Sequence, residues 1–479
     1  MSHVLISAAH KSSGKTTITL GLCAALRRRG LIVQPFKKGP DYIDPMWLTL
    51  AAGRDCHNLD FHSMTRDEIR GTFREYGHDS EINLIEGNKG LYDGLDLEGR
   101  NSNAALARMI KAPVVLVIDA QGMTRGIAPL ILGYQAFDKR MNIAGVILNK
   151  LGGKRHEGKL RAVIEHYTDV PVIGAVHKDE SLCITEQHLG LTPGTASVET
   201  INQIKTIADL IESQVDLDKF IQIASTAPQI KSPVTIKEPV SISTLDNISV
   251  GNKVRIGVAR DKAFGFYYPG DITALKDSGA EIIDINTFTD SKLPEIDGLF
   301  IGGGFPESYL QELANNAGLK RDIANAIESG LPVYAECGGL MYLTRSIKWD
   351  NQSHLMVGAI PADTEMCKKP QGRGYVRLKE TEHMSWAPEN GQQSGKEFCA
   401  HEFHYSKLIN TDPKVKYAYK VLRGFGIDGD NDGIIYKNVL ASYTHLRDVK
   451  HNRWASRFVN FVKDCKNNRE LLNTKQAYG

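Results

Sequence analysis

The sequence of 479 residues predicts an α/β protein with two domains, and three observations support this fold class. Short apolar runs alternate with helical stretches from the N-terminus to Ile223. The same alternation begins again at Arg255. The segment between them has three prolines, many Ser and Thr residues and no helical period, which favours a linker over an edge strand with a loop. We therefore expect a domain over 1–224, a linker over 225–252, a second domain over 253–467 and a tail over 468–479.

Each expected element follows from its apolar pattern. Apolar strands of about five residues separated by helices are typical of a parallel sheet covered on both faces. In the first domain, strands are expected at 4–8, 31–36, 82–86, 114–118, 143–148 and 172–175, with a helix at 16–29. In the second domain, strands are expected at 255–259, 281–285, 298–301, 331–335 and 439–443, with helices at 272–278, 319–329 and 453–463. After Met356 the sequence becomes β-like and rich in loops.

Composition limits the function classes. The 58 Lys and Arg residues nearly balance the 56 Asp and Glu residues, so charge gives no general reason to expect nucleic acid or a membrane as partner. No apolar run is long enough to span a bilayer, and the N-terminus lacks the features of a signal peptide. The seven cysteines are scattered without a CxxC pair, which favours free thiols in a reducing cytoplasm.

A phosphate-binding loop is predicted at residues 9–16, which read AHKSSGKT between an apolar strand and a helix. Backbone N–H groups of such a turn surround phosphates, the lysine reaches the outer phosphates, and the hydroxyl after it binds Mg²⁺. The alternative is a glycine turn with a solvent-exposed lysine. The loop alone does not separate kinases, GTPases, partition ATPases and ligases. The expected nucleotide-binding residues are Ser13, Gly14, Lys15, Thr16 and Thr17.

Two acidic motifs follow strands of the first domain: KKGPDYIDP at 37–45 and EGNKGLYDG at 86–94. Residues just past the ends of parallel strands converge on the crevice where ligands bind. Phosphates and Mg²⁺ there need carboxylate ligands, so Asp41 and Glu86 are candidate ligands together with Thr16. Asp44 and Asp93 are candidates to orient a second substrate. The alternative is that these residues only cap helices and form turns.

The second domain contains a candidate thiol nucleophile. Cys337 follows the expected strand at 331–335 and precedes two glycines and a helix, which is the pattern of a nucleophile elbow. A helix N-terminus favours the thiolate, and glycine N–H groups can bind an oxyanion. The oxyanion candidates are Gly338 and, from the loop after the strand at 298–301, Gly303 and Gly304. His445, at the end of the last strand, is the candidate base, with the motif HEFHYS at 401–406 as a second source of histidines.

Taken in order, these motifs resemble the cobyrinate a,c-diamide synthase family of glutamine amidotransferases. The motifs are the loop with Lys15, KKGPDYIDP, EGNKGLYDG, GGGFPE, AECGGLMYL, HEFHYS and LASYTHL. The resemblance covers nearly the whole chain. It implies an N-terminal P-loop domain with a parallel sheet, similar to dethiobiotin synthetase, and a C-terminal class I glutamine amidotransferase domain. It also implies ATP and Mg²⁺ as cofactors, with glutamine and a tetrapyrrole polycarboxylate as substrates.

The implied reaction is the amidation of a carboxylate. Cys337, with His445 as base, releases ammonia from glutamine, while ATP converts a substrate carboxylate into an acyl phosphate that the ammonia attacks. Ammonia that travels between the sites has to be shielded from water. The substrate-binding residues implied in the first domain are Asp41, Tyr42, Asp44, Lys89, Tyr92 and Asp93. We expect a monomer or a homodimer.

The sequence departs from the family pattern at two informative places. Many class I glutaminases have His-x-Glu, but Leu446 and Arg447 follow His445, so the third member of a triad is missing at that spacing. The typical family text EGVMGLYDG is EGNKGLYDG, which puts Asn88 and Lys89 beside the expected substrate crevice. Surface drift would explain Asn88 and Lys89 equally well. A sirohaem-amidating branch or a nickel-sirohydrochlorin synthase are alternatives to a cobyrinate substrate.

Two other function classes stay open at this point. A P-loop switch of the partition-ATPase kind would have a basic patch or an amphipathic tail and no thiol elbow, which disagrees with the near-zero charge and with Cys337. An inactive regulator derived from an amidotransferase would keep the motifs without the chemistry. The enzyme is the leading hypothesis: an ATP-dependent carbon–nitrogen ligase with glutamine as nitrogen donor.

Overall fold

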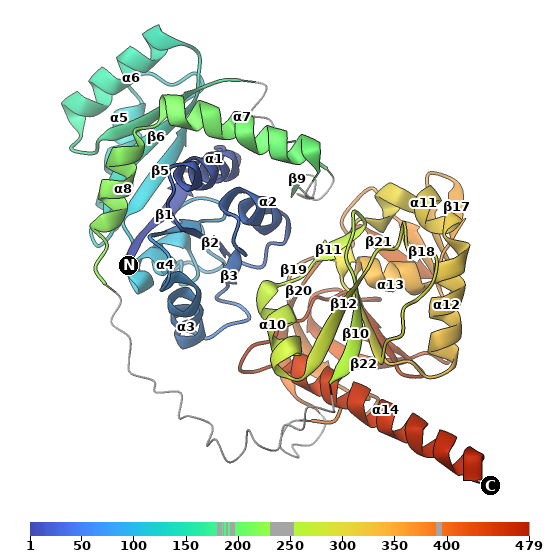
Figure 1. Ribbon diagram of the computed structural model, residues 1–479. Coiled ribbons are helices and arrows are strands. Elements are labelled where there is room, and N and C mark those ends of the chain that lie inside the picture. The colour runs from blue at the N-terminus through green and yellow to red at the C-terminus, as the bar shows by residue number, and fades with distance from the viewer. Residues whose placement is uncertain are drawn as a thin grey trace. The chain divides into compact units, whose positions relative to one another are not determined.

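The computed structural model describes residues 1–179, 184, 186–187, 190–191, 197–229, 253–388 and 395–478. The chain divides into two units, Met1–Thr235 and Ile236–Gly479, each with its own sheet (Figure 1). The division falls within the linker expected from the sequence, of which residues 230–252 lie outside the described residues.

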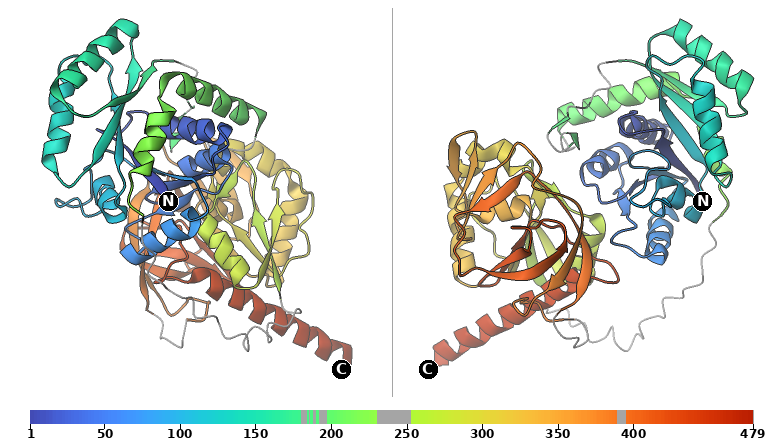
Figure 2. Two further views of the ribbon diagram at one scale, coloured as in Figure 1. Left: turned by 60° about the vertical axis from the view of Figure 1, so that its left-hand side comes forward. Right: turned by 180° about the vertical axis from the view of Figure 1, so that it is seen from behind.

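The first unit is built on a seven-stranded sheet in which every neighbouring pair is parallel, in the order β3-β2-β4-β1-β5-β6-β7. Helices cover both faces of this sheet, as the two views of Figure 2 show. The strands are β1 (Ser2–Ala8), β2 (Val33–Lys38), β3 (His57–Leu59), β4 (Ile82–Glu86), β5 (Val114–Asp119), β6 (Ile143–Leu151) and β7 (Val172–His177), with a separate pair β8 (Glu186–Gln187) and β9 (Gly190–Leu191). The parallel sheet expected from the apolar runs is confirmed.

The helices of the first unit pack through apolar faces, and a glycine allows two of them, α1 and α7, to lie close together. Gly21 lies on α1 where it meets α7, and a Cβ atom there would stand 2.3 Å from Cγ1 of Ile211. Only glycine therefore fits this crossing. The helices are α1 (Lys15–Arg28), α2 (Ile43–Ala52), α3 (Arg66–Gly77), α4 (Asn103–Ile110), α5 (Ile127–Phe137), α6 (Lys154–Tyr167), α7 (Val198–Gln214) and α8 (Leu217–Ser225).

Strand β2 lies two residues further along the chain than its apolar pattern predicts. The expected strand ends at residue 36, but Lys37 and Lys38 continue it and are almost completely buried. Two buried lysines contradict the ordinary preference of charged side chains for water, so hydropathy misses them. Carboxylate and amide oxygens at the ends of neighbouring elements accept their hydrogen bonds and explain the burial.

The second unit contains a nine-stranded mixed sheet in the order β12-β10-β13-β15-β24-β23-β22-β19-β20. The first five strands are parallel, and the rest pair antiparallel. The strands of this sheet are β10 (Val254–Ala259), β12 (Ala280–Ile285), β13 (Gly298–Ile301), β15 (Val333–Glu336), β19 (Gly372–Glu380), β20 (Glu397–His404), β22 (Lys416–Arg423), β23 (Asn431–Tyr436) and β24 (Val439–Ser442).

Smaller elements complete the second unit. They are the pair β11 (Phe264–Phe266) and β14 (Gly303–Gly304), the four-stranded sheet of β16 (Ser346–Trp349), β17 (Gln352–Leu355), β18 (Asp363–Met366) and β21 (Ser406–Ile409), and the helices α10 (Pro269–Asp277), η2 (Pro306–Tyr309), α11 (Leu310–Asn315), α12 (Ala317–Glu328), α13 (Gly338–Leu343) and α14 (Trp454–Tyr478). The β-like region expected after Met356 thus forms strands of the nine-stranded and the four-stranded sheet, most of them in antiparallel pairs.

The closing helix is longer than its sequence pattern predicts. Helix α14 continues to Tyr478, through the segment expected to be a tail, and its last turns project beyond the sheet (Figure 2). Basic side chains before these last turns attach the helix to the loop that precedes β13. Lys466 Nζ lies 3.1 Å from a carboxylate oxygen of Asp297, and Arg469 donates to the Asp297 carbonyl at 3.3 Å. In the part of the chain that the structure describes, no helix combines the length and the apolar character needed to cross a membrane.

Candidate functional site

The phosphate-loop residues lie between β1 and α1, as predicted. Gly14 immediately precedes α1 with φ of 86°, in the left-handed region, and a Cβ atom there would stand 2.1 Å from Nδ2 of Asn149. That Nδ2 donates to the Ser13 carbonyl at 2.9 Å, so glycine is required both by the turn and by this contact. Ser13 is fully buried, and its hydroxyl donates to the His10 carbonyl at 2.8 Å.

Residues at the ends of two other strands hold the loop, and the two that belong to β6, Asn149 and Lys150, were not identified from the sequence. Lys150 Nζ donates to the Ser12 carbonyl at 2.9 Å and to Asp119 Oδ2 at 2.7 Å. Asn149 and Lys150 belong to β6, and Asp119 ends β5. The signal available in the sequence was a polar Asn-Lys pair interrupting an apolar strand.

Lys15 begins α1 and is 7% exposed. Burial lowers its pKa, while the nearby carboxylate of Glu86 raises it. Thr16 and Thr17 follow in the first turn, where the N–H groups of a helix are free to bind an anion. The five residues predicted to bind nucleotide therefore lie together at one helix N-terminus.

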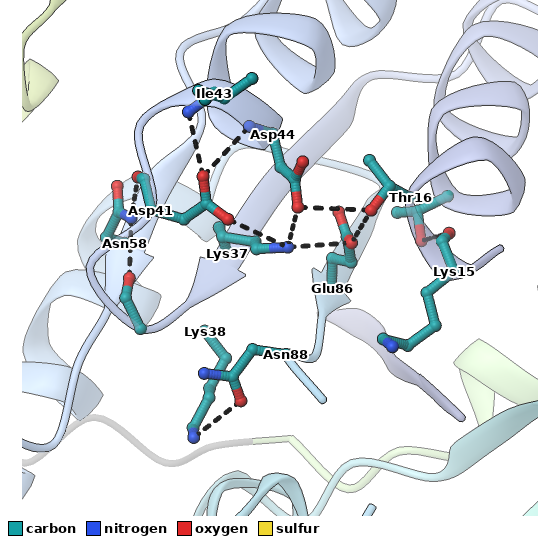
Figure 3. A network of polar contacts seen from close by, with 12 residues as sticks. Lys15, Thr16, Lys37, Lys38, Asp41, Ile43, Asp44, Asn58, Glu86 and Asn88 are labelled. Atoms are coloured by element: carbon teal, nitrogen blue, oxygen red, sulfur yellow. Dashed lines mark hydrogen bonds and ion pairs between the residues drawn. The ribbon is translucent and has the colours of Figure 1, made fainter. Parts of the chain in front are cut away.

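Thr16 faces a buried cluster of charges formed by the two acidic motifs (Figure 3). Its hydroxyl lies 2.7 Å from Glu86 Oε1 and 3.3 Å from Asp44 Oδ2. Lys37 Nζ donates to Glu86 Oε1 at 2.9 Å, donates to Asp44 Oδ2, and lies 3.7 Å from Asp41. One ammonium thus lies among three carboxylates, and the sequence analysis did not identify Lys37.

This cluster fits a divalent cation at Thr16 and Glu86. Oε2 of Glu86 is buried and has no hydrogen-bond partner among the described residues, so it is an acceptor available for a ligand. Mg²⁺ is usually bound by one or two carboxylates together with substrate phosphates. The described residues contain no group of three or more His, Cys, Asp or Glu side chains arranged to hold a metal by themselves. A cation held here would take its remaining ligands from outside these side chains, such as phosphate oxygens or water.

Asp41 and Asp44 occupy different places in the cluster. Asp41 Oδ1 accepts hydrogen bonds from the backbone N–H groups of Ile43 and Asp44 at 3.0 and 3.2 Å, which fixes the start of α2. Asp44, expected to orient substrate, is the aspartate that reaches Thr16. Burial and the neighbouring Asp44 raise the pKa of Asp41 to about 7, and burial also raises the pKa of Glu86. Burial opposes charge on Lys37, but Asp44, Glu86 and Asp41 raise its pKa well above the ordinary value.

The other predicted substrate residues lie around the same strand ends. Tyr42 is buried directly before α2. Asp93 accepts the Gly90 N–H at 2.8 Å and so shapes the loop after β4. The Tyr92 hydroxyl donates to the Tyr134 carbonyl at 2.6 Å, which directs it toward α5. Lys89 is exposed and has a positive φ of 47°.

Lys38 and Asn88 form a polar pair beside the cluster (Figure 3). Lys38 Nζ donates to Asn88 Oδ1 at 2.9 Å, so the amide NH₂ group of Asn88 is the side that can donate elsewhere. Burial lowers the pKa of Lys38 to about 8, with the charges of Lys89 and Lys37 acting in the same direction and Asp60 opposing. Asn88, where this sequence differs from the family motif EGVMGLYDG, is therefore hydrogen-bonded to the buried Lys38.

Cys337 has the strained backbone of a nucleophile elbow. It connects β15 to α13 with φ of 48°, a region that non-glycine residues rarely adopt. Its N–H donates to the Ser442 carbonyl at 2.7 Å, and its carbonyl accepts the Met341 N–H at 3.0 Å. The side chain is 6% exposed, so the thiol lies in a largely enclosed position.

His445 lies against this elbow. The sequence left open which groups contact its ring, and the structure shows them. The backbone of His445 pairs with His401 through hydrogen bonds of 2.7 and 3.3 Å, which attaches it to strand β20. Nδ1 lies 3.3 Å from Oε2 of Glu336, the residue before Cys337. Burial lowers the pKa of His445, but hydrogen bonds with Cys337 and Glu336 raise it, with a net value of about 10.

The glycines predicted to form the oxyanion site lie around the same two residues. A Cβ atom at Gly303 would stand 2.5 Å from Cε1 of His445, and one at Gly338 would stand 3.1 Å from the nitrogen of Gly304. The two glycine turns are therefore in contact, as expected. His404 lies elsewhere: its ring stacks on Tyr443 with centroids 3.9 Å apart, and its Nδ1 contacts the Ser406 carbonyl at 2.8 Å.

The two sites define a protein that joins a P-loop nucleotide-binding unit to a class I-type glutaminase unit. Comparison with known proteins agrees: residues 5–189 match the CobQ/CobB/MinD/ParA nucleotide binding domain, and residues 255–452 match the CobB/CobQ-like glutamine amidotransferase domain. The chain belongs to the cobyrinate a,c-diamide synthase family. The expected ATP-dependent carbon–nitrogen ligase with glutamine as nitrogen donor is confirmed at the level of this family.

Relatives named cobyrinate a,c-diamide synthase extend over nearly the whole chain. One from Magnetococcus marinus is 42% identical and aligns over 96% of this chain and 97% of its own length. One from Methanosarcina acetivorans is 41% identical over 95% of this chain and 94% of its own. One from Dehalococcoides mccartyi is 40% identical over 96% and 98%.

Proposed function

We propose that this protein uses ATP and glutamine to convert side-chain carboxylates of a tetrapyrrole into amides. The observation that carries the proposal is that one chain holds two different sites, a thiol and imidazole pair at Cys337 and His445 and a P-loop facing buried carboxylates. A nitrogen donor and an activated carboxylate are the two requirements of ATP-dependent amide synthesis. Full-length relatives carry the name cobyrinate a,c-diamide synthase.

In the second unit, His445 holds the proton of the Cys337 thiol as an imidazolium, and the sulfur, as a thiolate, attacks the side-chain carbonyl carbon of glutamine. The C–N bond breaks, and the nitrogen leaves as ammonia with the proton that His445 returns. Water then hydrolyses the glutamyl thioester, which releases glutamate and restores the thiol. The N–H groups of Gly303, Gly304 and Gly338 are our candidates to stabilise the oxyanion.

In the first unit, the γ-phosphoryl group of ATP passes to a carboxylate oxygen and gives an acyl phosphate and ADP. This activation is needed because a carboxylate is a poor electrophile. Ammonia attacks the acyl carbon, the bond to the phosphate oxygen breaks, and the proton lost by nitrogen leaves with the phosphate. Lys15 and Lys37 offset negative charge during the transfer. Mg²⁺, held by Thr16 and Glu86 with Asp44 or Asp41, would neutralise the phosphate oxygens.

Ammonia has to reach the acyl phosphate in its neutral form, because ammonium has no free electron pair for attack. We therefore propose that it passes between the sites shielded from water. If so, synthesis from glutamine is insensitive to a drop in pH that abolishes synthesis from added ammonia.

We further propose that the ring substrate is a polycarboxylate of the sirohaem or sirohydrochlorin type. The supporting observation is the donor group formed by Lys38 at the end of β2 and by Asn88 and Lys89 after β4, where Lys38 fixes the orientation of the Asn88 amide. Such donors suit carboxylates on a ring substrate. Cobyrinate and nickel-sirohydrochlorin are the alternatives that a substrate comparison separates.

Two tests address the two halves. A glutamine-like diazoketone should label Cys337 covalently, and a chain that neither labels nor releases glutamate from glutamine is not an active amidotransferase.

Lys15→Ala should abolish amide synthesis with glutamine and with ammonia while part of the glutaminase activity survives, because the two sites are separate. Amide formation retained in this variant would contradict the role of the P-loop.

A further inference from the structure

Glu336 is a buried carboxylate whose two oxygens have different partners. It is the last residue of β15, is 2% exposed and directly precedes Cys337. Oε2 lies 3.3 Å from Nδ1 of His445. Oε1 accepts the backbone N–H of Leu446 at 2.8 Å and the hydroxyl of Tyr334. The strand, the tyrosine and the residue after the histidine together fix where this carboxylate points.

This geometry matches what a catalytic histidine requires from a carboxylate. A carboxylate at Nδ1 accepts the Nδ1–H, so the other ring nitrogen is the one that exchanges a proton with the nucleophile. It also stabilises the imidazolium that forms when His445 takes the proton of Cys337. Since Leu446 donates to the same carboxylate, the backbone next to His445 is held by the group that orients its ring.

We infer that Glu336 is the positioning residue of His445, so that the third member of the triad comes from the strand before the nucleophile. Class I glutaminases with His-x-Glu place it two residues after the histidine, where this chain has Arg447. The inference rests on the proposed glutaminase activity of Cys337 and deepens it.

Two other buried carboxylates of this unit have different tasks. Asp432 accepts the backbone N–H groups of Tyr443 and Thr444, both at 3.0 Å. Glu402 accepts those of Phe425 and Gly426, both at 2.8 Å. Both carboxylates hold backbone, and Oε2 of Glu402 also lies 3.8 Å from Nε2 of His404. Glu336 instead contacts the ring of His445. Glu402 is therefore a matched control, since it is as buried as Glu336 and each of its oxygens accepts a hydrogen bond, but the histidine that it contacts is His404.

The charge on Glu336 also predicts a pH effect. Hydrogen bonds with Cys337 and Glu336 overcome the effect of burial and raise the pKa of His445 to about 10. Replacing the carboxylate by an amide removes one of these contributions, so His445 loses its proton at lower pH. The other titratable groups that act on this pair are Cys337, His401, Tyr334, Tyr267, Tyr419 and Asp271.

The test compares glutaminase kinetics of the full-length chain and of Glu336→Gln across pH. We expect kcat to fall by about 10²-fold with KM changed by less than about 3-fold, because the ring loses its orientation while glutamine still binds. The alkaline limb of the kcat profile should move to lower pH. Synthesis from added ammonia should persist. Glu402→Gln should leave the alkaline limb unchanged.

An unchanged alkaline limb together with kcat within about 2-fold of the wild type overturns the inference. If Glu336→Gln does not fold, Glu336→Asp keeps the charge and withdraws it by one methylene. It should lower kcat while the alkaline limb stays near that of the wild type, and unchanged kcat again overturns the inference. A wild-type chain that releases no glutamate contradicts the proposed function instead, so the two failures are distinguishable.

Discussion

The ammonium of Lys37 lies 2.9 Å from Oε1 of Glu86, and both side chains are almost completely buried on neighbouring parallel strands. The Thr16 hydroxyl contacts the Glu86 carboxylate, and the Asp44 carboxylate contacts the Lys37 ammonium. A charge removed from water needs a partner, so this pair organises the end of the sheet where the phosphate loop begins. The relationship leads to the first prediction.

Lys37→Met should destabilise the chain strongly. The methionine has a similar length but leaves Glu86, Asp44 and Asp41 without their common cation. Breaking a buried pair in this way costs about 3–5 kcal/mol of unfolding free energy. Denaturant unfolding measures the change, and Lys139→Met, at an exposed lysine, is the control with an expected effect below about 0.5 kcal/mol. Equal stability of both variants would show that the buried cluster tolerates loss of its ammonium.

Cys337→Ala should abolish the use of glutamine and leave amide synthesis from concentrated ammonia intact, because only the second unit needs the thiol. The measurement is amide formation with each nitrogen donor at saturating ATP. Cys399→Ala, at a partly exposed cysteine of the same unit, is the control and should behave as the wild type. Equal loss with both donors contradicts the separation of the sites.

Gly303→Ala should impair the glutaminase through His445. The added Cβ atom would stand 2.5 Å from Cε1 of the imidazole, so the ring has to shift. Misplacement of a catalytic group by about 1 Å can cost about 10²-fold in rate, and we expect a loss of that order in kcat. Gly270→Ala is the matched control, because no atom beyond its chain neighbours and its own helix backbone lies within 4 Å of its Cβ position. Normal glutaminase kinetics in Gly303→Ala would show that the turn and the ring are not in contact.

Glutaminase activity should persist into the alkaline range. The pKa of His445 is raised from 6.5 to about 10, so the ring keeps its proton at neutral pH and loses it near pH 10. Activity that depends on this proton falls there. The stability contribution has the same sign: it is fully present below pH 6.5 and is lost as the pH rises through 10. Initial rates and urea unfolding from pH 6 to 10.5, about half a unit past that pKa, measure both. A rate profile that titrates near 6.5 contradicts the raised pKa.

Much of the fold could be predicted because its strands are apolar runs. The strands at 82–86 and 298–301 have the expected bounds, and each is completely buried between two parallel neighbours. Charged residues limit this reasoning: Lys37 and Lys38 lie in β2 although hydropathy ends the strand before them. Their burial depends on carboxylate and amide partners from other elements, which periodicity does not reveal.

The residues of the candidate sites also differ in how far the sequence alone could identify them. Residues whose role depends on local sequence, such as Gly14 or Cys337, could be identified from the chain alone, since a glycine turn between strand and helix is a local pattern. Glu336 could not, because its partner His445 is 109 residues away and the pairing of β15 with β24 brings them together. Asn149 was missed for the same reason, as its contact with Ser13 spans 136 residues.

The most direct test of the proposed function is a substrate comparison. The chain receives ATP, Mg²⁺ and glutamine labelled with heavy nitrogen at its amide, together with sirohaem, sirohydrochlorin or cobyrinate in separate reactions. Mass spectrometry then counts the amides formed on each ring. We predict ATP-dependent incorporation of labelled nitrogen into a ring carboxylate, greatest with the sirohaem or sirohydrochlorin type. A chain that hydrolyses glutamine but transfers nitrogen to none of the three rings would contradict the assignment as a tetrapyrrole amidotransferase.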